Sequence, residues 1–399
     1  MLKELLVKPC NGLIQKEKIN ILFFMMNQKN VIIIMIDGGR LDRAQNSKIF
    51  KNLKSKSIFF SNSITYGPHT IAAMHAVFSG SYGTRTGTNS YWSTYKFKKD
   101  KFKTLAEYLK AENFVTHADV INQLVVPKQG FDNYIVHDEL NDDLVKRHKI
   151  LLDEMNNKNP DNSFFLYLHY SKIHTGIMNE VLKKYDNYSE DFFSNREKNE
   201  SRYDTLFEDA ENYLDEILIK ISQLELDKNS IILVMSDHGI SVGEKIGERA
   251  YGAFCYDYTL RNFAYFVIPG YESVEITKQV RTIDYMPTFL HLLKISQDNT
   301  FSKMDGISLI PLIEGKNLTE NYAFSETGNP LKNKAPPKEP NTKSIRTSDW
   351  KLIFNEYNET RELYNLQMDP SENNNLIGTG EKMEEILWIE LQNLINKCD

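Results

Sequence analysis

Two segments made almost entirely of apolar residues, far apart in the chain, each end in an aspartate. Residues 31–36 run directly into Asp37, and residues 230–236 run into Asp237 and His238. Apolar runs of this length are typical of strands that are buried on both faces of a parallel sheet. Because ligands bind at the carboxyl ends of the strands in an open α/β sheet, we expect both acids to meet at one edge of a single sheet.

The rest of the chain alternates between strand and helix patterns. This alternation predicts an α/β fold, in which a mostly parallel sheet is sandwiched by helices. We predict strands over residues 31–36, 56–61, 114–119, 163–169, 230–236 and 263–268. We predict helices over residues 102–110, 203–224 and 284–293. A chain of 399 residues is long enough for one large domain and a smaller one.

The composition of the chain changes near residue 330, where prolines punctuate a lysine-rich stretch that is typical of an exposed loop. We therefore expect an N-terminal extension over residues 1–28, a main domain over residues 29–328 and a small α+β subdomain over residues 329–399. In the subdomain we predict short antiparallel strands and a closing helix, over residues 344–354, 361–366 and 382–395.

Charge and cysteine content exclude several classes of protein. A formal net charge of −6 gives no reason to expect a nucleic acid or an anionic membrane as a partner. The apolar run over residues 19–26 is shorter than the roughly 20 residues of a membrane span, and it lacks a signal-peptide cleavage site. The three cysteines are widely separated, which predicts free thiols in a reducing compartment. We expect a cytoplasmic protein.

The two strand-end acids are candidate metal ligands. A bare carboxylate at the end of a buried strand is costly unless a cation or a hydrogen-bond donor meets it. For Asp37 or Asp237 alone, a helix N-cap is an equally good interpretation. The two acids together with His238 favour one divalent metal ion. Oxygen ligands with a single imidazole suit Ca²⁺, Mg²⁺ or Mn²⁺, and Zn²⁺ is the alternative.

A third segment places a hydroxyl group at the start of a helix. Gly67 and Pro68 predict a turn, and residues 71–78 are compatible with a helix. Thr70 therefore lies at or near a helix N-terminus, where the dipole and the free N–H groups favour an anion. One interpretation is a simple N-cap. The other is a nucleophile, because a metal that binds the hydroxyl lowers its pKa.

These segments and several later ones resemble the sulfatase branch of the alkaline phosphatase superfamily. The matching segments are residues 37–40, 70–80, 164–174, 203–215, 236–239, 256–261, 284–288, 305–309, 346–351 and 362–370. The resemblance implies an α/β core with a small C-terminal subdomain, and a metal-dependent enzyme acting on sulfate or phosphate esters. It also implies that His174 faces the substrate, where it stabilises the anion or protonates the leaving oxygen. Arg40 is expected to contact the bound anion.

The chain departs from the sulfatase pattern at several positions. Sulfatases carry a cysteine or serine that becomes formylglycine where this chain has Thr70, and oxidation of threonine would give a ketone instead. Met74 stands in place of the supporting arginine, and Gly38 in place of a second aspartate. The family's Lys-His pair falls near residues 119–123, and a later lysine falls near residues 252–253; neither is matched.

A threonine nucleophile is typical of relatives in the phosphoryl branch, which usually bind two zinc ions. Their second site takes an aspartate four residues before a histidine, and Tyr170 occupies that position before His174. His169 is an alternative ligand whose direction the sequence does not fix. The leading hypothesis is one metal held by Asp37, Thr70, Asp237 and His238. Other histidines, including His137 and His148, lie in no motif and are expected to fill the surface or the core.

The leading functional hypothesis is a hydrolase in which Thr70 attacks the sulfur or phosphorus of an ester. The type of nucleophile favours phosphoryl chemistry, although the resemblance is to sulfatases. The expected partner is an anionic ester substrate, with a carbohydrate-linked ester as one option. One alternative is a transferase that moves a phosphoryl-type headgroup onto a glycan or lipid. The other is a catalytically inactive binding protein on a sulfatase fold. The sequence gives no oligomeric state.

Overall fold

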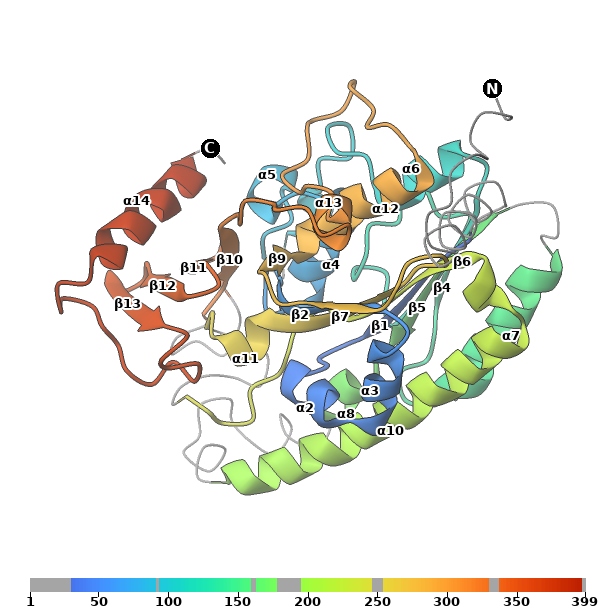
Figure 1. Ribbon diagram of the computed structural model, residues 1–399, viewed down its shortest axis with the longest axis horizontal. Coiled ribbons are helices and arrows are strands. Elements are labelled where there is room, and N and C mark those ends of the chain that lie inside the picture. Colours follow the sequence, from blue (N-terminus) through green and yellow to red (C-terminus); the bar gives the residue numbers. More distant parts are fainter. Residues whose placement is uncertain are drawn as a thin grey trace, which may run out of the picture.

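The computed structural model describes residues 30–90, 93–158, 163–177, 195–245, 254–329 and 337–396. Its main feature is a nine-stranded sheet in the order β4-β3-β5-β1-β6-β7-β2-β8, with β9 paired to β2 (Figure 1). The strands are β1 (Asn30–Ile36), β2 (Ile58–Ile64), β3 (Val115–Val120), β4 (Asn133–Val136), β5 (Phe164–Tyr170), β6 (Ser230–Ser236), β7 (Arg261–Val267), β8 (Val274–Ile276) and β9 (Val280–Arg281). The predicted mostly parallel α/β fold is confirmed.

The sheet is parallel at its centre and reverses at one strand. β1 pairs in parallel with β5 on one side and with β6 on the other. β7 runs antiparallel to both of its neighbours, β6 and β2. Because of this reversal, the first residues of β7 lie at the same edge as the last residues of β1 and β6. The sequence prediction missed this reversal and the short strands β4, β8 and β9.

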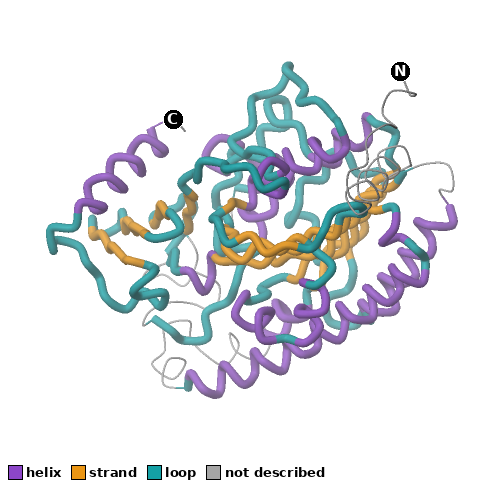
Figure 2. The backbone as a smooth tube through the Cα atoms, viewed as in Figure 1, coloured by secondary structure: helices purple, strands orange, loops and turns teal. Residues whose placement is uncertain are grey.

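Helices cover both faces of the sheet, as Figures 1 and 2 show. One face carries α2 (Leu41–Asn46), α3 (Lys48–Lys54), α7 (Leu144–Lys158), α8 (Lys172–Gly176) and α10 (Arg196–Gln223). The other carries α4 (Thr70–Ser79), α5 (Gly83–Thr86), α6 (Leu105–Ala111), α12 (Tyr285–Leu293) and α13 (Ile310–Ile313). Single-turn 3₁₀ helices cover Thr94–Lys96, Leu226–Lys228 and Thr282–Asp284.

The apolar residues of β1 divide between the two faces because side chains alternate along a strand. The even-numbered residues of β1 pack into the core under α2, α3, α7 and α10. The odd-numbered ones pack into the core under α4, α6 and α12. All seven residues of the strand are buried, which explains why the six that follow Asn30 are all apolar. No helix of the described ranges has the length and apolar character of a membrane span.

Capping side chains set some helix boundaries that the apolar pattern misplaced. The helix predicted from residue 102 begins at Leu105, because Thr104 forms a capping box with Glu107. The hydroxyl of Thr104 accepts from the Glu107 N–H, and the carboxylate of Glu107 accepts from the Thr104 N–H. The long helix α10 begins at Arg196, earlier than its apolar stripe indicated.

The C-terminal part forms a separate antiparallel sheet in the order β10-β11-β12-β13. Its strands are β10 (Ala323–Thr327), β11 (Thr342–Arg346), β12 (Trp350–Asn355) and β13 (Thr360–Asn365), and α14 (Lys382–Asn396) packs against them. The segment 344–354 is therefore two strands joined by a turn, in which the Thr347 N–H donates to the Trp350 carbonyl at 2.8 Å. Since β10 precedes residue 329, we now place the start of the subdomain at or before Ala323. The expected extension over residues 1–28 lies outside the described residues.

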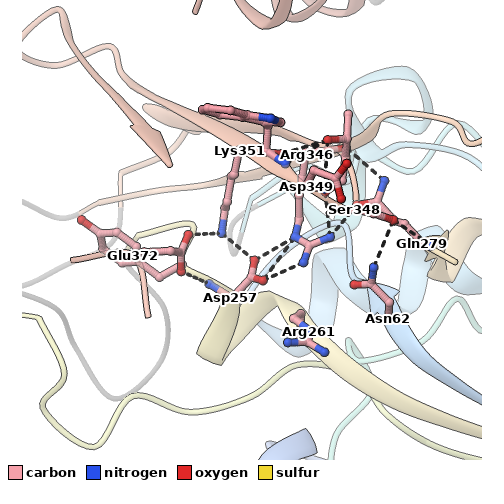
Figure 3. Close-up of polar contacts among 12 residues, drawn as sticks. Asn62, Asp257, Arg261, Gln279, Arg346, Ser348, Asp349, Lys351 and Glu372 are labelled. Atoms are coloured by element: carbon pink, nitrogen blue, oxygen red, sulfur yellow. Dashed lines mark hydrogen bonds and ion pairs between the residues drawn. The ribbon is translucent and has the colours of Figure 1, made fainter. Parts of the chain in front are cut away.

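Buried ion pairs fasten this subdomain to the main domain, as Figure 3 shows. Asp257 is the first residue of α11 (Asp257–Leu260). Its carboxylate lies 2.8 Å from Arg346 Nη2 and 2.9 Å from Lys351 Nζ. Lys351 also lies 2.8 Å from Glu372 Oε1, and Glu372 Oε2 accepts from the Asp257 N–H at 2.7 Å. Two acids and two cations thus pair with one another, and all four side chains are buried.

Candidate metal centre and active site

The two strand-end acids lie side by side because β1 and β6 are adjacent and in register, with Ile36 opposite Ser236. The possible ligand atoms of Asp37, Asp237 and His238 all lie within 4.8 Å of one another. The backbone N–H of Gly38 donates to Asp237 Oδ1 at 3.1 Å, which ties the two strand ends together. The edge of the sheet therefore gathers two carboxylates and one imidazole.

Thr70 points its hydroxyl group at this cluster. Its Oγ1 lies 3.2 Å from Asp37 Oδ2 and 3.4 Å from His238 Nε2. Thr70 is the first residue of α4, and the N-cap is His69, whose Nδ1 accepts from the Ala72 N–H. The simple N-cap interpretation of Thr70 is therefore wrong. The side chain is free to face the acids, with the N-terminus of a ten-residue helix behind it.

The tautomer of His238 suits a metal ligand. Its Nδ1 lies 2.7 Å from the Gly239 carbonyl, so Nδ1 carries the proton and donates it there. The lone pair of Nε2 then faces two acids, 3.3 Å from Asp237 Oδ2 and 3.8 Å from Asp37 Oδ1. Lone pairs that face one another in a buried site repel unless a cation lies between them.

Two carboxylate oxygens support the same interpretation. Asp37 Oδ1 and Asp237 Oδ2 are buried, and neither makes a hydrogen bond of regular geometry within the described part of the chain. Burial raises the pKa of Asp237, and the adjacent charge of Asp37 raises it further. A divalent cation would satisfy both oxygens and remove this repulsion. Together with Thr70 Oγ1 and His238 Nε2, these acids form a donor set that fits a divalent metal.

Two histidines from the end of β5 complete the surroundings of Asp37. His169 Nε2 lies 3.0 Å from Asp37 Oδ2, and His174, on α8, places Nδ1 3.6 Å from Asp37 Oδ1. Burial alone would raise the pKa of Asp37, but His174 and His169 lower it well below its usual range. The side chain of His174 is 25% exposed, whereas that of His169 is fully buried. His174 therefore lies on the rim of the site, and His169 lies beneath it.

The guanidinium of Arg40 is bound by residues of the loops that follow β1 and β6. Its guanidinium donates to the Ile240 carbonyl at 2.9 Å and to both oxygens of Asp42, and it is paired with Glu244. Its backbone N–H donates to Tyr203 Oη, which in turn donates to the Gly38 carbonyl. These contacts hold the loops after β1 and β6 together, and the expected contact of Arg40 with a bound anion stays a prediction.

The positions that depart from the sulfatase pattern have structural explanations. Gly38 has a φ of +73°, which L side chains rarely adopt, and an added Cβ would come within 2.4 Å of Ile240 Cδ1, so an aspartate there would strain the backbone and displace the end of Ile240. Met74 is fully buried in the core under α4. Asp119 is buried and pairs with other side chains of the chain. Residues 252–253 lie outside the described residues.

The sequence left the direction of His169 open, and His69 follows the predicted Gly67-Pro68 turn without belonging to the predicted donor set. His169 is buried against Asp37, and the parallel pairing of Met35 with His169 could have indicated this, since β1 neighbours β5. His69 adjoins the nucleophile candidate and is partly buried; desolvation and the nearby His238 lower the pKa of His69 to about 3. A neutral His69 is consistent with a site that concentrates positive charge at a metal.

Comparisons with known proteins agree with this geometry. Residues 29–295 match the Sulfatase family, and residues 253–398 match the family N-sulphoglucosamine sulphohydrolase, C-terminal. No curated protein sequence matches the chain. The structure is similar to that of a 2-O GAG sulfatase, with 17% identity, a TM-score of 0.72 and 93% of each chain covered.

Two further structures are similar over nearly the whole chain. One was solved in complex with its substrate D-glucosamine-2-N,6-O-disulfate; it has 17% identity and a TM-score of 0.70, covering 93% of this chain and 97% of that one. The other is a phosphonate monoester hydrolase from Silicibacter pomeroyi, with 14% identity and a TM-score of 0.73, covering 93% of this chain and 95% of that one. At these identities the likeness establishes the fold.

Proposed function

The chain belongs to the sulfatase family, and we propose that it is a metal-dependent ester hydrolase in which Thr70 is the nucleophile. The observation that carries this proposal is the position of Thr70 Oγ1. It lies 3.2 Å from Asp37 Oδ2 and 3.4 Å from His238 Nε2, beside two buried carboxylate oxygens that have no hydrogen-bond partner among the described residues. A threonine in this position can attack an ester directly, whereas it cannot form the formylglycine of other sulfatases.

Asp37, Thr70, Asp237 and His238 would hold the divalent metal. A cation bound there supplies positive charge that stabilises the developing oxyanions and favours the ionised form of a hydroxyl. Side chains and backbone of the chain itself orient the nucleophile. Asp37 accepts the hydrogen bond of Thr70 and orients the oxygen, and the dipole of α4 favours negative charge at its first residue.

In the proposed reaction, the hydroxyl of Thr70 gives its proton to a solvent water, and its oxygen bonds to the phosphorus or sulfur of the ester while the bond to the leaving oxygen breaks. His174 is the best-placed donor of a proton to that leaving oxygen, because it is the partly exposed histidine on the rim of the site. Water then cleaves the bond to Thr70, which restores the hydroxyl group. His169 is proposed to orient Asp37 through its hydrogen bond at 3.0 Å.

The charge of the site indicates how much negative charge the ester substrate carries. Met74 and Asp119 stand where the family pattern has cationic side chains, so the described part of the site offers few cations besides the proposed metal. A singly charged ester, such as a sulfate monoester, a phosphate diester or a phosphonate monoester, fits this charge better than a doubly charged phosphate monoester. Among these, the threonine favours phosphoryl chemistry. We propose a carbohydrate-linked ester as substrate, since one similar structure holds a sulfated sugar as its substrate.

The experiment is an activity comparison of the wild type with Thr70→Ala and Thr70→Ser, using aryl sulfate, aryl phosphate, phosphodiester and phosphonate substrates with Mn²⁺, Ca²⁺ or Zn²⁺. We expect Thr70→Ala to lose at least about 1,000-fold in kcat, and Thr70→Ser to keep much of it because it keeps the hydroxyl. Full activity in Thr70→Ala would refute the mechanism. Faster transfer to an added sugar than to water would instead establish a transferase, and absence of both metal and turnover would establish a binding protein.

A further inference from the structure

A second buried cluster lies beside the strand that carries the site histidines. Asp119 is the next-to-last residue of β3 and lies opposite Leu168, the neighbour of His169 on β5. Its Oδ1 lies 2.6 Å from His137 Nδ1 and 3.3 Å from His148 Nε2, and all three side chains are fully buried. Burial would raise the pKa of Asp119, but the hydrogen bonds from both histidines lower it below its usual range. Asp119 is therefore a carboxylate that accepts from both rings.

The hydrogen bonds of this cluster define a direction toward the active site. We assign the Nδ1–H tautomer to His137 because Nδ1 lies against the Asp119 carboxylate, and in this tautomer Nε2 is an acceptor. Ser171 Oγ lies 3.0 Å from that nitrogen and donates to it. Ser171 immediately precedes α8, and its hydroxyl does not cap the helix, since it is used by His137. Its carbonyl accepts from the Thr175 N–H, so Ser171 fixes the single turn in which His174 lies.

The cluster of Asp119, His137 and His148 also supports the turn between β5 and α8 through Tyr213. His148 Nδ1 lies 2.7 Å from Tyr213 Oη, and the ring of Tyr213 packs 4.4 Å from the ring of Tyr170, the last residue of β5. The ring of His137 is perpendicular to that of His169, with the ring centroids 6.1 Å apart. The strand-to-helix turn between His169 and His174 is thus held at Tyr170 and at Ser171 by the same group of side chains.

Asp119, His137 and His148 also have the residue types of a metal site, but their contacts do not need a cation. Arg147 Nε lies 2.6 Å from Asp119 Oδ2 and balances its charge. Each ring nitrogen of His137 and His148 has a hydrogen-bond partner. The proposed metal site differs, because the buried oxygens Asp37 Oδ1 and Asp237 Oδ2 have no hydrogen-bond partner among the described residues.

We propose that Asp119, His137 and Ser171 form a hydrogen-bond relay that positions His174 for proton donation to the leaving group. The proposal rests on the proposed function, in which His174 performs that step. These three are positioning residues, since no described contact joins them to Asp37, Thr70 or Asp237. Of the three, only Asp119 falls in the segment 119–123, where the family pattern has its Lys-His pair.

Matched variants of His137 and Ser171 test the relay. His137→Asn keeps a donor to Asp119 but loses the contact with Ser171, whereas His137→Gln keeps a group at the distance of Nε2. We expect Ser171→Ala and His137→Asn to lower kcat about 10- to 100-fold for esters with poor leaving groups. We expect little effect on 4-nitrophenyl esters or on KM, and a smaller loss in His137→Gln. A uniform loss on all leaving groups would overturn the relay.

A double-variant comparison separates positioning from general structural damage. If Ser171 acts through His174, Ser171→Ala costs nothing further in a His174→Gln background. Additive losses would show that Ser171 acts independently and would overturn the relay. Retained turnover in Thr70→Ala would overturn the proposed nucleophile alone, because the leaving-group comparison still reports on His174.

NMR spectra and crystal structures test the proposed relay in the absence of substrate. We expect ¹⁵N–¹H spectra of histidine-labelled protein to show His137 as the Nδ1–H tautomer. We expect crystals of Ser171→Ala to show the His174 ring displaced while Asp37 and Asp237 stay in place. An unmoved ring would overturn the relay. So would a metal ion that is lost on His148→Gln but retained on Asp237→Asn.

Discussion

The backbone N–H of Gly38 donates to Asp237 Oδ1 at 3.1 Å, so the loop after β1 is bonded directly to the acid after β6. This contact requires the backbone of Gly38 to adopt a φ of +73° and to pass close to Ile240. A glycine here is therefore a condition for bringing the two proposed metal-binding acids together, and it explains why this position lacks the second aspartate of the sulfatase pattern.

Substitution of Gly38 tests this explanation. We expect Gly38→Ala to lower the free energy of unfolding by roughly 2–4 kcal/mol, because positive φ costs about 1–2 kcal/mol and the new Cβ would overlap Ile240. Gly315→Ala is the matched control, since it has a φ of +75° and nothing within 4 Å of the added Cβ. The free energy of unfolding of Gly315→Ala should fall only by the cost of a positive φ. Equal losses in the two variants, measured by urea denaturation, would show that the contact with Ile240 is unimportant.

The ion pairs around Asp257 make a prediction about how the subdomain is attached. Lys351 is fully buried between Asp257 and Glu372, so Lys351→Met leaves two buried acids without their shared cation. We expect a loss of about 3–5 kcal/mol in unfolding free energy. Lys228→Met, which removes an exposed pair with Glu225, should leave the unfolding midpoint unchanged. A Lys351→Met protein as stable as the wild type would mean that these pairs do not hold the subdomain in place.

Glu326 makes a prediction about pH. It lies on β10, buried, where it accepts a hydrogen bond from Tyr66 of the loop that leads to Thr70. Burial raises the pKa of Glu326 to about 7, although Tyr66 and Lys343 oppose the shift. The folded chain therefore holds this proton at pH values where the unfolded chain has lost it. The stability from this group is complete below the ordinary glutamate pKa, and it is lost as pH rises through about 7.

We therefore expect unfolding free energy to fall between about pH 5 and pH 7.5 in the wild type, with Glu326 contributing on the order of 3 kcal/mol. Glu326→Gln keeps an acceptor for Tyr66 without the ionisation, so its stability should fall less over this range. Chemical denaturation at a series of pH values measures the difference. Parallel pH profiles for the two proteins would show that Glu326 ionises at its ordinary pKa.

Much of the fold was predictable because burial on both faces forces an uninterrupted apolar sequence. The central strands β1 and β6, and the acids that follow them, are visible for that reason. Short edge strands such as β4 and β8 lack this signal, since only one face or neither is buried. The reversal of β7 was not predictable, because a strand's direction depends on the connection that precedes it.

The candidate site was predictable where a residue follows a strand end and not where it depends on side-chain direction. Asp37, Asp237 and His238 come directly after buried strands, and Thr70 comes at a helix start. Arg40 also lies close behind the end of β1 in the sequence, but its guanidinium forms ion pairs with Asp42 and Glu244. His137 and His148 lie in no motif, and only the pairing of β3 with β4 and β5 brings the first of them near the site.

The most direct test of the account is the metal content of purified protein. Elemental analysis after dialysis against Mn²⁺, Ca²⁺ or Zn²⁺ should find one tightly bound divalent ion per chain in the wild type. Asp37→Asn and Asp237→Asn should each lose it, whereas Asp119→Asn, which alters the neighbouring cluster, should retain it. A wild-type chain without a divalent ion, or Asp37→Asn and Asp237→Asn proteins that hold as much metal as the wild type, would contradict the shared cation.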